Sequence, residues 1–91
     1  MPSYLVETYL SRGSAGERSA RERRARLAAE ELARELATVR FEQSIHIPED
    51  EICFFVFRAD SSTDAALVAQ RAQLEPLRVV EVAPNREEDR K

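Results

Sequence analysis

The stretch from Val39 to Arg58, VRFEQSIHIPEDEICFFVFR, predicts a β-hairpin around which the rest of the chain can be arranged. Apolar and polar residues alternate from Val39 to Ile47, which is the period of a strand with one apolar face. The run from Ile52 to Phe57 is apolar throughout and rich in aromatic and β-branched residues, as in a strand covered on both faces. Pro48 cannot donate a hydrogen bond to a neighbouring strand, and the acidic residues after it favour a turn. We therefore expect the first strand at a sheet edge and the second inside the sheet.

The length of the turn decides which side chains of the hairpin share a face. A four-residue turn, Pro48 to Glu51, pairs His46 with Cys53, whereas a three-residue turn would put these two side chains on opposite faces. We favour the four-residue turn because loops of that length are commonly built on a type I turn. On that register one face carries Glu42, Ser44, His46, Cys53, Phe55 and Phe57.

The flanking sequence predicts two helices and two further strands. Alternation from Ser3 to Leu10 indicates a first strand, and the apolar segment from Leu77 to Ala83 indicates a last one. Ser14 followed by Glu17 has the pattern of a capping box, so a helix should begin there. A second helix is expected from Ser62 to Gln73. The apolar stripe of the first helix would comprise Ala25, Ala28, Ala29, Leu32 and Leu36.

The order strand-helix-strand-strand-helix-strand predicts a ferredoxin-like α+β fold, a four-stranded antiparallel sheet with both helices on one face. Residues 1–84 would form this single domain. Residues 85–91 would be a disordered charged tail, because they include no apolar side chain.

Two helices cover only one face of such a sheet, yet the predicted third strand is apolar on both. The uncovered face would therefore carry an apolar patch, which normally marks an interface. We predict a homodimer, a dimeric α+β barrel, in which the open sheet faces pack against each other or around a shared cleft. The patch would comprise Leu5, Tyr9, Phe55, Phe57 and Val80 or Val82.

Composition narrows the classes of function. The chain has 91 residues and a net charge of −3, which gives no reason to expect a nucleic-acid partner. Its single cysteine excludes an internal disulfide and any zinc site built on paired cysteines. Glu7 interrupts the only apolar run near the amino terminus, so no signal peptide or membrane span is expected there. We expect a cytoplasmic protein with no membrane partner.

Candidate chemistry is concentrated in polar side chains of the predicted strands. Carboxylate, imidazole and thiolate groups are ligands for nickel, zinc or copper. No ligand pair has a diagnostic spacing, and a buried cysteine usually packs rather than reacts, so a packing role is the alternative for Cys53. Tyr9, Glu7 and His46 could instead move protons in an apolar cleft. The candidate cluster consists of Glu7, Tyr9, Glu42, Ser44, His46 and Cys53.

The predicted first helix is rich in arginine. Glutamates lie among the arginines, and no aromatic residue is present to stack on a base. This pattern favours a solvated helix face with ion pairs between residues four apart over a phosphate-binding surface. The arginines are Arg18, Arg21, Arg23, Arg24 and Arg26.

Five short sequence features follow one another along the chain: Val6-Glu7, Ser44, Cys53, Ala59-Asp60 and Val80-Glu81-Val82. In this order they resemble a family of small bacterial ferredoxin-like proteins of mostly unassigned function, which includes a nickel-binding protein from an actinobacterium. The resemblance implies the ferredoxin-like fold, dimerisation and nickel binding. The chain departs from the family at Thr8, where an arginine is usual, and at Arg12-Gly13, where a proline is common.

The leading hypothesis is a small dimeric cytoplasmic protein that binds a divalent transition metal, nickel first, on or near the open sheet face. Its metal ligands would be Glu7, His46, Cys53 and Glu42, and its role would be binding rather than catalysis. The alternative is a cofactor-free monooxygenase or cyclase acting on a hydrophobic small molecule in the sheet cleft. A third hypothesis is a structural or regulatory protein that docks a partner on the arginine-rich helix. A closed pocket between sheet and helices would favour the enzyme, and a surface cluster of histidine, glutamate and cysteine would favour the metal.

Overall fold

The computed structural model describes residues 1–35 and 38–83. Leu36 of the predicted stripe and the predicted tail lie outside these residues. The order of elements is the expected βαββαβ, with a 3-10 helix before α1 and another in the hairpin. In chain order the elements are β1 (Ser3–Tyr9), η1 (Arg12–Glu17), α1 (Arg18–Glu35), β2 (Val39–Ile47), η2 (Pro48–Asp50), β3 (Ile52–Ala59), α2 (Ser62–Arg71) and β4 (Arg78–Val82).

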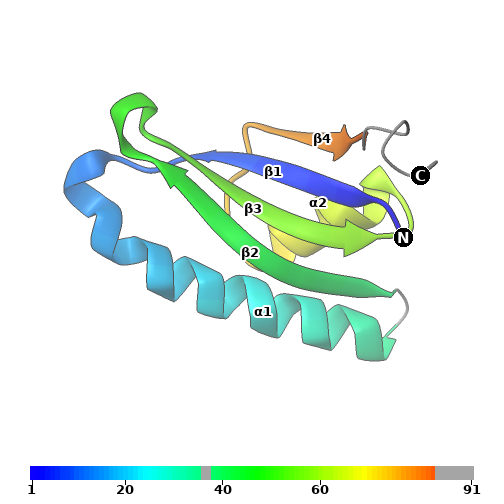
Figure 1. Cartoon of the computed structure of the whole chain (residues 1–91). Helices are drawn as coiled ribbons and strands as arrows, with labels where there is room; N and C mark the ends of the chain where they lie inside the picture. The colour runs from blue at the N-terminus through cyan, green and yellow to red at the C-terminus, as the bar shows by residue number, and fades with distance from the viewer. Residues whose placement is uncertain (36–37, 84–91) are drawn as a thin grey trace, which may run out of the picture.

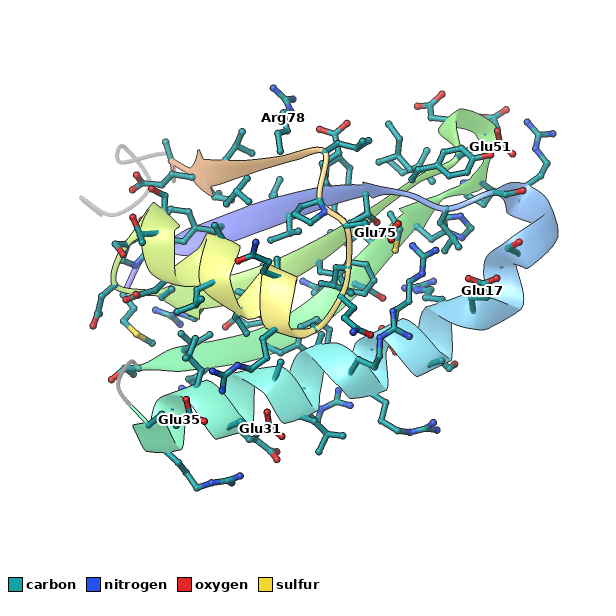
Figure 2. All side chains as sticks on the ribbon, turned by 180° about the vertical axis from the view of Figure 1, so that it is seen from behind. Glu17, Glu31, Glu35, Glu51, Glu75 and Arg78 are labelled. Atoms are coloured by element: carbon teal, nitrogen blue, oxygen red, sulfur yellow. The ribbon has the colours of Figure 1, made fainter. Side chains whose placement is uncertain are left out.

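The four strands form one antiparallel sheet in the order β2-β3-β1-β4. The hairpin strand with the apolar run, β3, is interior, and β2 is an edge, as the sequence predicts. Both helices lie on one side of the sheet. Figure 1 views the strands with α2 behind them, and the reverse view in Figure 2 places α2 in front. The protein therefore has the ferredoxin-like α+β fold. No helix in the described parts of the chain is long and apolar enough to cross a membrane.

Local signals set the ends of several elements. Ser61 caps α2 by accepting a hydrogen bond from the Asp64 backbone at 3.1 Å, as expected of an N-cap serine. The predicted capping role of Ser14 is wrong, because this residue lies within η1, which ends before α1 begins. Ser11 is the residue that accepts a backbone hydrogen bond at this turn, from Gly13.

The hairpin has the predicted four-residue turn, in which Ile47 pairs with Ile52 and His46 with Cys53. Pro48 stands at the first position of η2, where a backbone donor is not needed. Glu51 closes the turn in the left-handed conformation, with φ of 55°. The register prediction is therefore confirmed.

A β-bulge in β2 changes the face of the sheet toward which the side chains in the second half of that strand point. The pairing shifts between Phe41, which lies opposite Phe57, and Gln43, which lies opposite Val56. Because one residue is inserted, the alternation inverts beyond Glu42. Val39 and Phe41 therefore share the helix-covered face with Ser44 and His46. The single uninterrupted alternation predicted from Val39 to Ile47 is wrong for this reason.

The same register places Phe55 and Phe57 in the core, each with no exposed surface. They lie opposite Val6 and Tyr4 of β1, whose side chains face the helices. The expectation that these two phenylalanines line the open face is therefore wrong, because β3 is apolar on both sides and gives no sign of which side the helices cover. The helices meet this face mainly with small side chains, which leave room for the rings. These are Ala25, Ala28 and Ala29 of α1 and Ala65 and Ala69 of α2.

We predict that Phe55→Ala lowers the free energy of unfolding by about 3–5 kcal/mol, because it leaves a cavity in the fully buried centre of the sheet. Leu27→Ala is the matched control, since that side chain is 52% exposed on α1. Urea denaturation followed by circular dichroism measures both values. Equal destabilisation by the two substitutions would contradict the assignment of the core.

Candidate functional site

The structure brings together two of the four predicted metal ligands. His46 and Cys53 are cross-strand partners on the helix-covered face. Glu7 lies on the other face, where its carboxylate accepts a hydrogen bond from Arg78 Nε at 2.7 Å. Glu42 stands at the bulge, with its carboxylate 3.8 Å from Arg58. Within residues 1–35 and 38–83, no three histidine, cysteine, aspartate or glutamate side chains are grouped as a metal site requires.

Cys53 is fully enclosed beneath the helices. Its backbone carbonyl accepts a hydrogen bond from Thr8 Oγ1 at 2.8 Å. Burial raises the pKa of the Cys53 thiol, an effect that the nearby guanidinium groups of Arg18 and Arg21 oppose. Because the thiolate is the form that ligates metals and attacks electrophiles, this environment favours a packing role.

His46 is half-buried at the end of β2. Its Nε2 lies 3.3 Å from the backbone carbonyl oxygen of Leu10. A carbonyl can only accept, so Nε2 donates in this contact and the neutral ring keeps the lone pair on Nδ1. That nitrogen is then the ligand that the imidazole can offer to a metal.

A polar cluster that sequence reasoning missed joins the start of α1 to β2. Arg18 donates from Nε to Ser44 Oγ and from Nη2 to the Ser44 carbonyl oxygen, both at 2.8 Å. The Ser44 hydroxyl in turn donates to the Glu22 carboxylate. Ser44 is almost fully buried, and its position under α1 follows from the bulge in β2. We call Arg18, Glu22 and Ser44 the anchor cluster.

The solvated-face interpretation of the arginine-rich helix holds only in part. Arg21 pairs with Glu17 four residues before it, as expected, but it also donates to the carbonyl oxygen of Tyr9 at 2.9 Å. Arg24 donates to the carbonyl oxygen of Ala72 at 2.9 Å, at the carboxyl end of α2. Carbonyl groups at the ends of strands and helices lack partners within their own element, so these arginines satisfy them.

Two further contacts tie α1 to its neighbours. The Arg26 guanidinium lies 5.3 Å from the centre of the Phe41 ring, within cation–π range. Arg71 of α2 lies 2.9 Å from Glu35 and 3.9 Å from Glu31, the two carboxylates labelled on α1 in Figure 2. The hydrogen bond from Arg71 holds the pKa of Glu35 below its ordinary value.

A hollow of about 300 Å³ lies between α1 and the edge strand β2. Ala29, Ala33 and Phe41 contribute its apolar lining, and Arg26 and Glu30 its charged lining. It lies at the side of the molecule, whereas Phe55 and Phe57 fill the space between sheet and helices. The hollow is therefore not the closed cleft that the enzyme hypothesis requires.

The sheet face opposite the helices, which we call the open face, is largely apolar. No described helix covers it (Figure 1). Ile45 and Ile47 are 41% and 37% exposed there, so the bulge has turned two large apolar side chains outward. The apolar residues of the open face come from all four strands: Leu5 of β1, Ile45 and Ile47 of β2, Ile52, Phe54 and Val56 of β3, and Val80 and Val82 of β4.

Comparison with known proteins supports the fold. No protein-family model matches the sequence, and no curated protein matches it. Among solved structures the chain is similar to SCO4226 from Streptomyces coelicolor A3(2), with a TM-score of 0.69. The two sequences are 19% identical, and the match covers 91% of this chain and 98% of that one. At this identity the likeness shows the ferredoxin-like fold and nothing about function.

We predict that Ser44→Ala destabilises the protein by about 1–3 kcal/mol, because Arg18 and Glu22 lose a partly buried hydrogen-bonding partner. Ser19→Ala, at an exposed position of α1, is the control and should change stability by less than about 0.5 kcal/mol. Chemical denaturation of both variants checks the prediction. A Ser44→Ala variant no less stable than the control would show that the anchor cluster contributes nothing.

Proposed function

We propose that the protein is a homodimeric binding protein whose two protomers meet through the open face. The observation that carries this proposal is the row of apolar side chains that all four strands place on a face without helices. Ile45, Ile47 and Val82 are exposed in this row and most of the others are half-buried, and a contiguous apolar patch of this kind marks an interaction site.

The dimensions of the open face suit such a contact. Four strands at about 4.8 Å spacing and seven residues of β1 give a face of roughly 20 Å by 20 Å. The flat area of such a face is roughly 400 Å², about half of the roughly 800 Å² per partner of a standard protein interface, and the corrugation of its side chains increases the area that can be buried. In a two-fold dimer both protomers contribute the same patch, and an apolar patch can pack against its own copy.

Two pairs of charged groups at the open face are compatible with burial against a second protomer, whereas Arg40, opposite Arg58 in the register, is a further exposed charge on this face. Glu7 is paired with Arg78, and Glu42 with Arg58, within one chain. A charge that carries its own partner costs less to remove from water than an isolated one. The open face can therefore be covered without leaving these carboxylates unpaired.

For the dimer, we predict that the double variant Ile45→Asp, Ile47→Asp is monomeric, because two carboxylates would have to be buried in the contact. Multi-angle light scattering after gel filtration at micromolar concentration measures the mass. Leu27→Asp, exposed on α1 and remote from the open face, should remain dimeric. A monomeric wild-type protein under these conditions would overturn the proposal.

A second candidate function is transition-metal binding, nickel first, and the pairing of His46 with Cys53 is the observation that favours it. The pair supplies one imidazole nitrogen and one sulfur, both ligand types for nickel, zinc or copper. The remaining metal ligands would have to be water molecules or other groups of the protein. Because Cys53 is enclosed, His46 is the ligand open to an arriving metal ion.

If nickel binds at this pair, its affinity should rise with pH, since the imidazole must be neutral and the thiol, whose pKa burial has raised, must lose its proton. We predict that His46→Ala lowers the nickel affinity at least about tenfold. Removing a group that only hydrogen-bonds to a metal ligand already costs about that much, so removing a ligand should cost no less. Calorimetric titration of the wild type and of Glu7→Gln provides the comparison. Glu7 lies on the opposite face, so its variant should bind as the wild type does, and equal affinity in His46→Ala would exclude this site.

A further inference from the structure

We propose that the hollow between α1 and β2 binds a small organic carboxylate, with the carboxylate group at Arg26 and an apolar body between the helix and the strand. This inference is independent of the proposed dimer, because the hollow lies at the side of the molecule and not on the open face. Figure 1 shows the two elements that form it, with α1 running along the edge strand β2. The residues that line it are Arg26, Ala29, Glu30 and Ala33 of α1 and Val39 to Phe41 of β2.

The size of the hollow suits a small molecule. Its volume of about 300 Å³ lies at the lower end of the range of about 300–1,000 Å³ found for ligand pockets. Arg26 and Ala33 stand at its two ends along α1, and at about 1.5 Å per residue they are roughly 10 Å apart. The hollow can therefore hold an apolar body of about that length.

The apolar part of the lining would contact such a body. Ala29 and Val39 are buried beneath the hollow, the Phe41 ring is half-buried, and Ala33 is exposed. The alanines of α1 leave open a space that larger side chains would fill. An apolar body in this space would remove the exposed part of the Phe41 ring and the methyl group of Ala33 from water, which favours binding.

The charged part of the lining favours an anion, because it has two arginines and one glutamate. Within residues 1–35 and 38–83, neither Arg26 nor Arg40 forms an ion pair. The Arg26 guanidinium lies over the Phe41 ring, 5.3 Å from its centre. A guanidinium stacked in this way keeps N–H donors in its own plane, where they suit a bidentate contact with a carboxylate. Arg40, on the edge strand, borders the hollow and adds a second positive charge.

A second hollow of about 160 Å³, between α1 and α2, provides a comparison within the same molecule. It is also lined by two arginines, but both have partners. Arg24 donates to the Ala72 carbonyl oxygen at 2.9 Å, and Arg71 pairs with Glu31 and Glu35. An anion would have to compete with those groups, whereas at the α1–β2 hollow the guanidinium of Arg26 is available.

Titration with octanoate, followed by ¹⁵N–¹H NMR spectra of the labelled protein, tests the site. We expect saturable shifts of the backbone amides of Ala33 and Phe41, with smaller changes at Leu5 and Val80, which lie on the open face. Octylamine has the same apolar chain and the opposite charge. It should bind at least about tenfold more weakly, because its ammonium group cannot accept hydrogen bonds from Arg26.

Four variants separate the contributions of charge and shape. Arg26→Gln should weaken octanoate binding at least about tenfold, the change expected when hydrogen bonds to a charged group are lost. Arg23→Gln, at an exposed arginine of α1 outside the lining, is the matched control and should bind as the wild type does. Glu30→Gln should bind at least as tightly as the wild type, since it removes a repelling charge. Ala33→Phe fills the hollow without changing its charge and should abolish binding.

The NMR spectrum of each variant also shows whether it is folded. Equal affinities of Arg26→Gln and Arg23→Gln would overturn the proposed site, and so would equal binding of octanoate and octylamine. Shifts confined to the amides of the open face would show that octanoate only covers the apolar sheet, and would also overturn it. A wild-type protein that shows no saturable shift at millimolar octanoate would have the same consequence. None of these results depends on whether the protein is a dimer.

Discussion

The inserted residue in β2 determines what both faces of the sheet present. Because Glu42 is accommodated as a bulge, Ser44 turns toward α1 while Ile45 and Ile47 turn outward. An unbulged strand would instead bury those isoleucines and leave Ser44 in solvent, which would remove both the anchor cluster and a corner of the apolar open face. Bulges are common in edge strands, where they also raise the local twist and discourage pairing with other chains. One irregularity of β2 therefore supports the placement of the first helix and the apolar character of the opposite surface.

The helix-covered face is held together by two complementary kinds of contact. Alanines on both helices allow them to approach the sheet closely enough for Phe55 and Phe57 to fill the core. Such a close approach places backbone carbonyl groups of the strands and of α2 against α1, where they need hydrogen-bond donors. Arginines of α1 supply them by donating to carbonyl oxygens of β1, β2 and the carboxyl end of α2. The arginine-rich helix thus contributes to folding through its polar side chains as well as its apolar stripe. Charge content alone does not reveal this role, since the same arginines would suit a solvated surface.

The sequence was sufficient to predict the features that depend on local signals. Pro48 and the acidic residues after it specify the hairpin and its register, and Ser61 specifies the start of α2. Features that depend on contacts between residues far apart in the chain could not be predicted from the sequence. Glu42 and Gln43 are both polar, so the sequence pattern does not reveal the bulge. The strand β3 is apolar on both faces, so it does not indicate which face the helices cover. Glu7 and Cys53 lie on neighbouring strands, but on opposite faces, and the predicted metal cluster divides for that reason.

This division has a consequence for function. His46 and Cys53 lie under the helices, whereas the apolar patch lies on the other side of the same sheet. The backbone layer between them carries no side chain from one face to the other, because successive side chains of a strand alternate between faces. A metal at the histidine–cysteine pair would reside within each protomer and would not bridge two protomers across the open face. The proposed self-association and the proposed metal binding therefore concern opposite faces of the sheet, and changes to one face can be interpreted without assuming effects on the other.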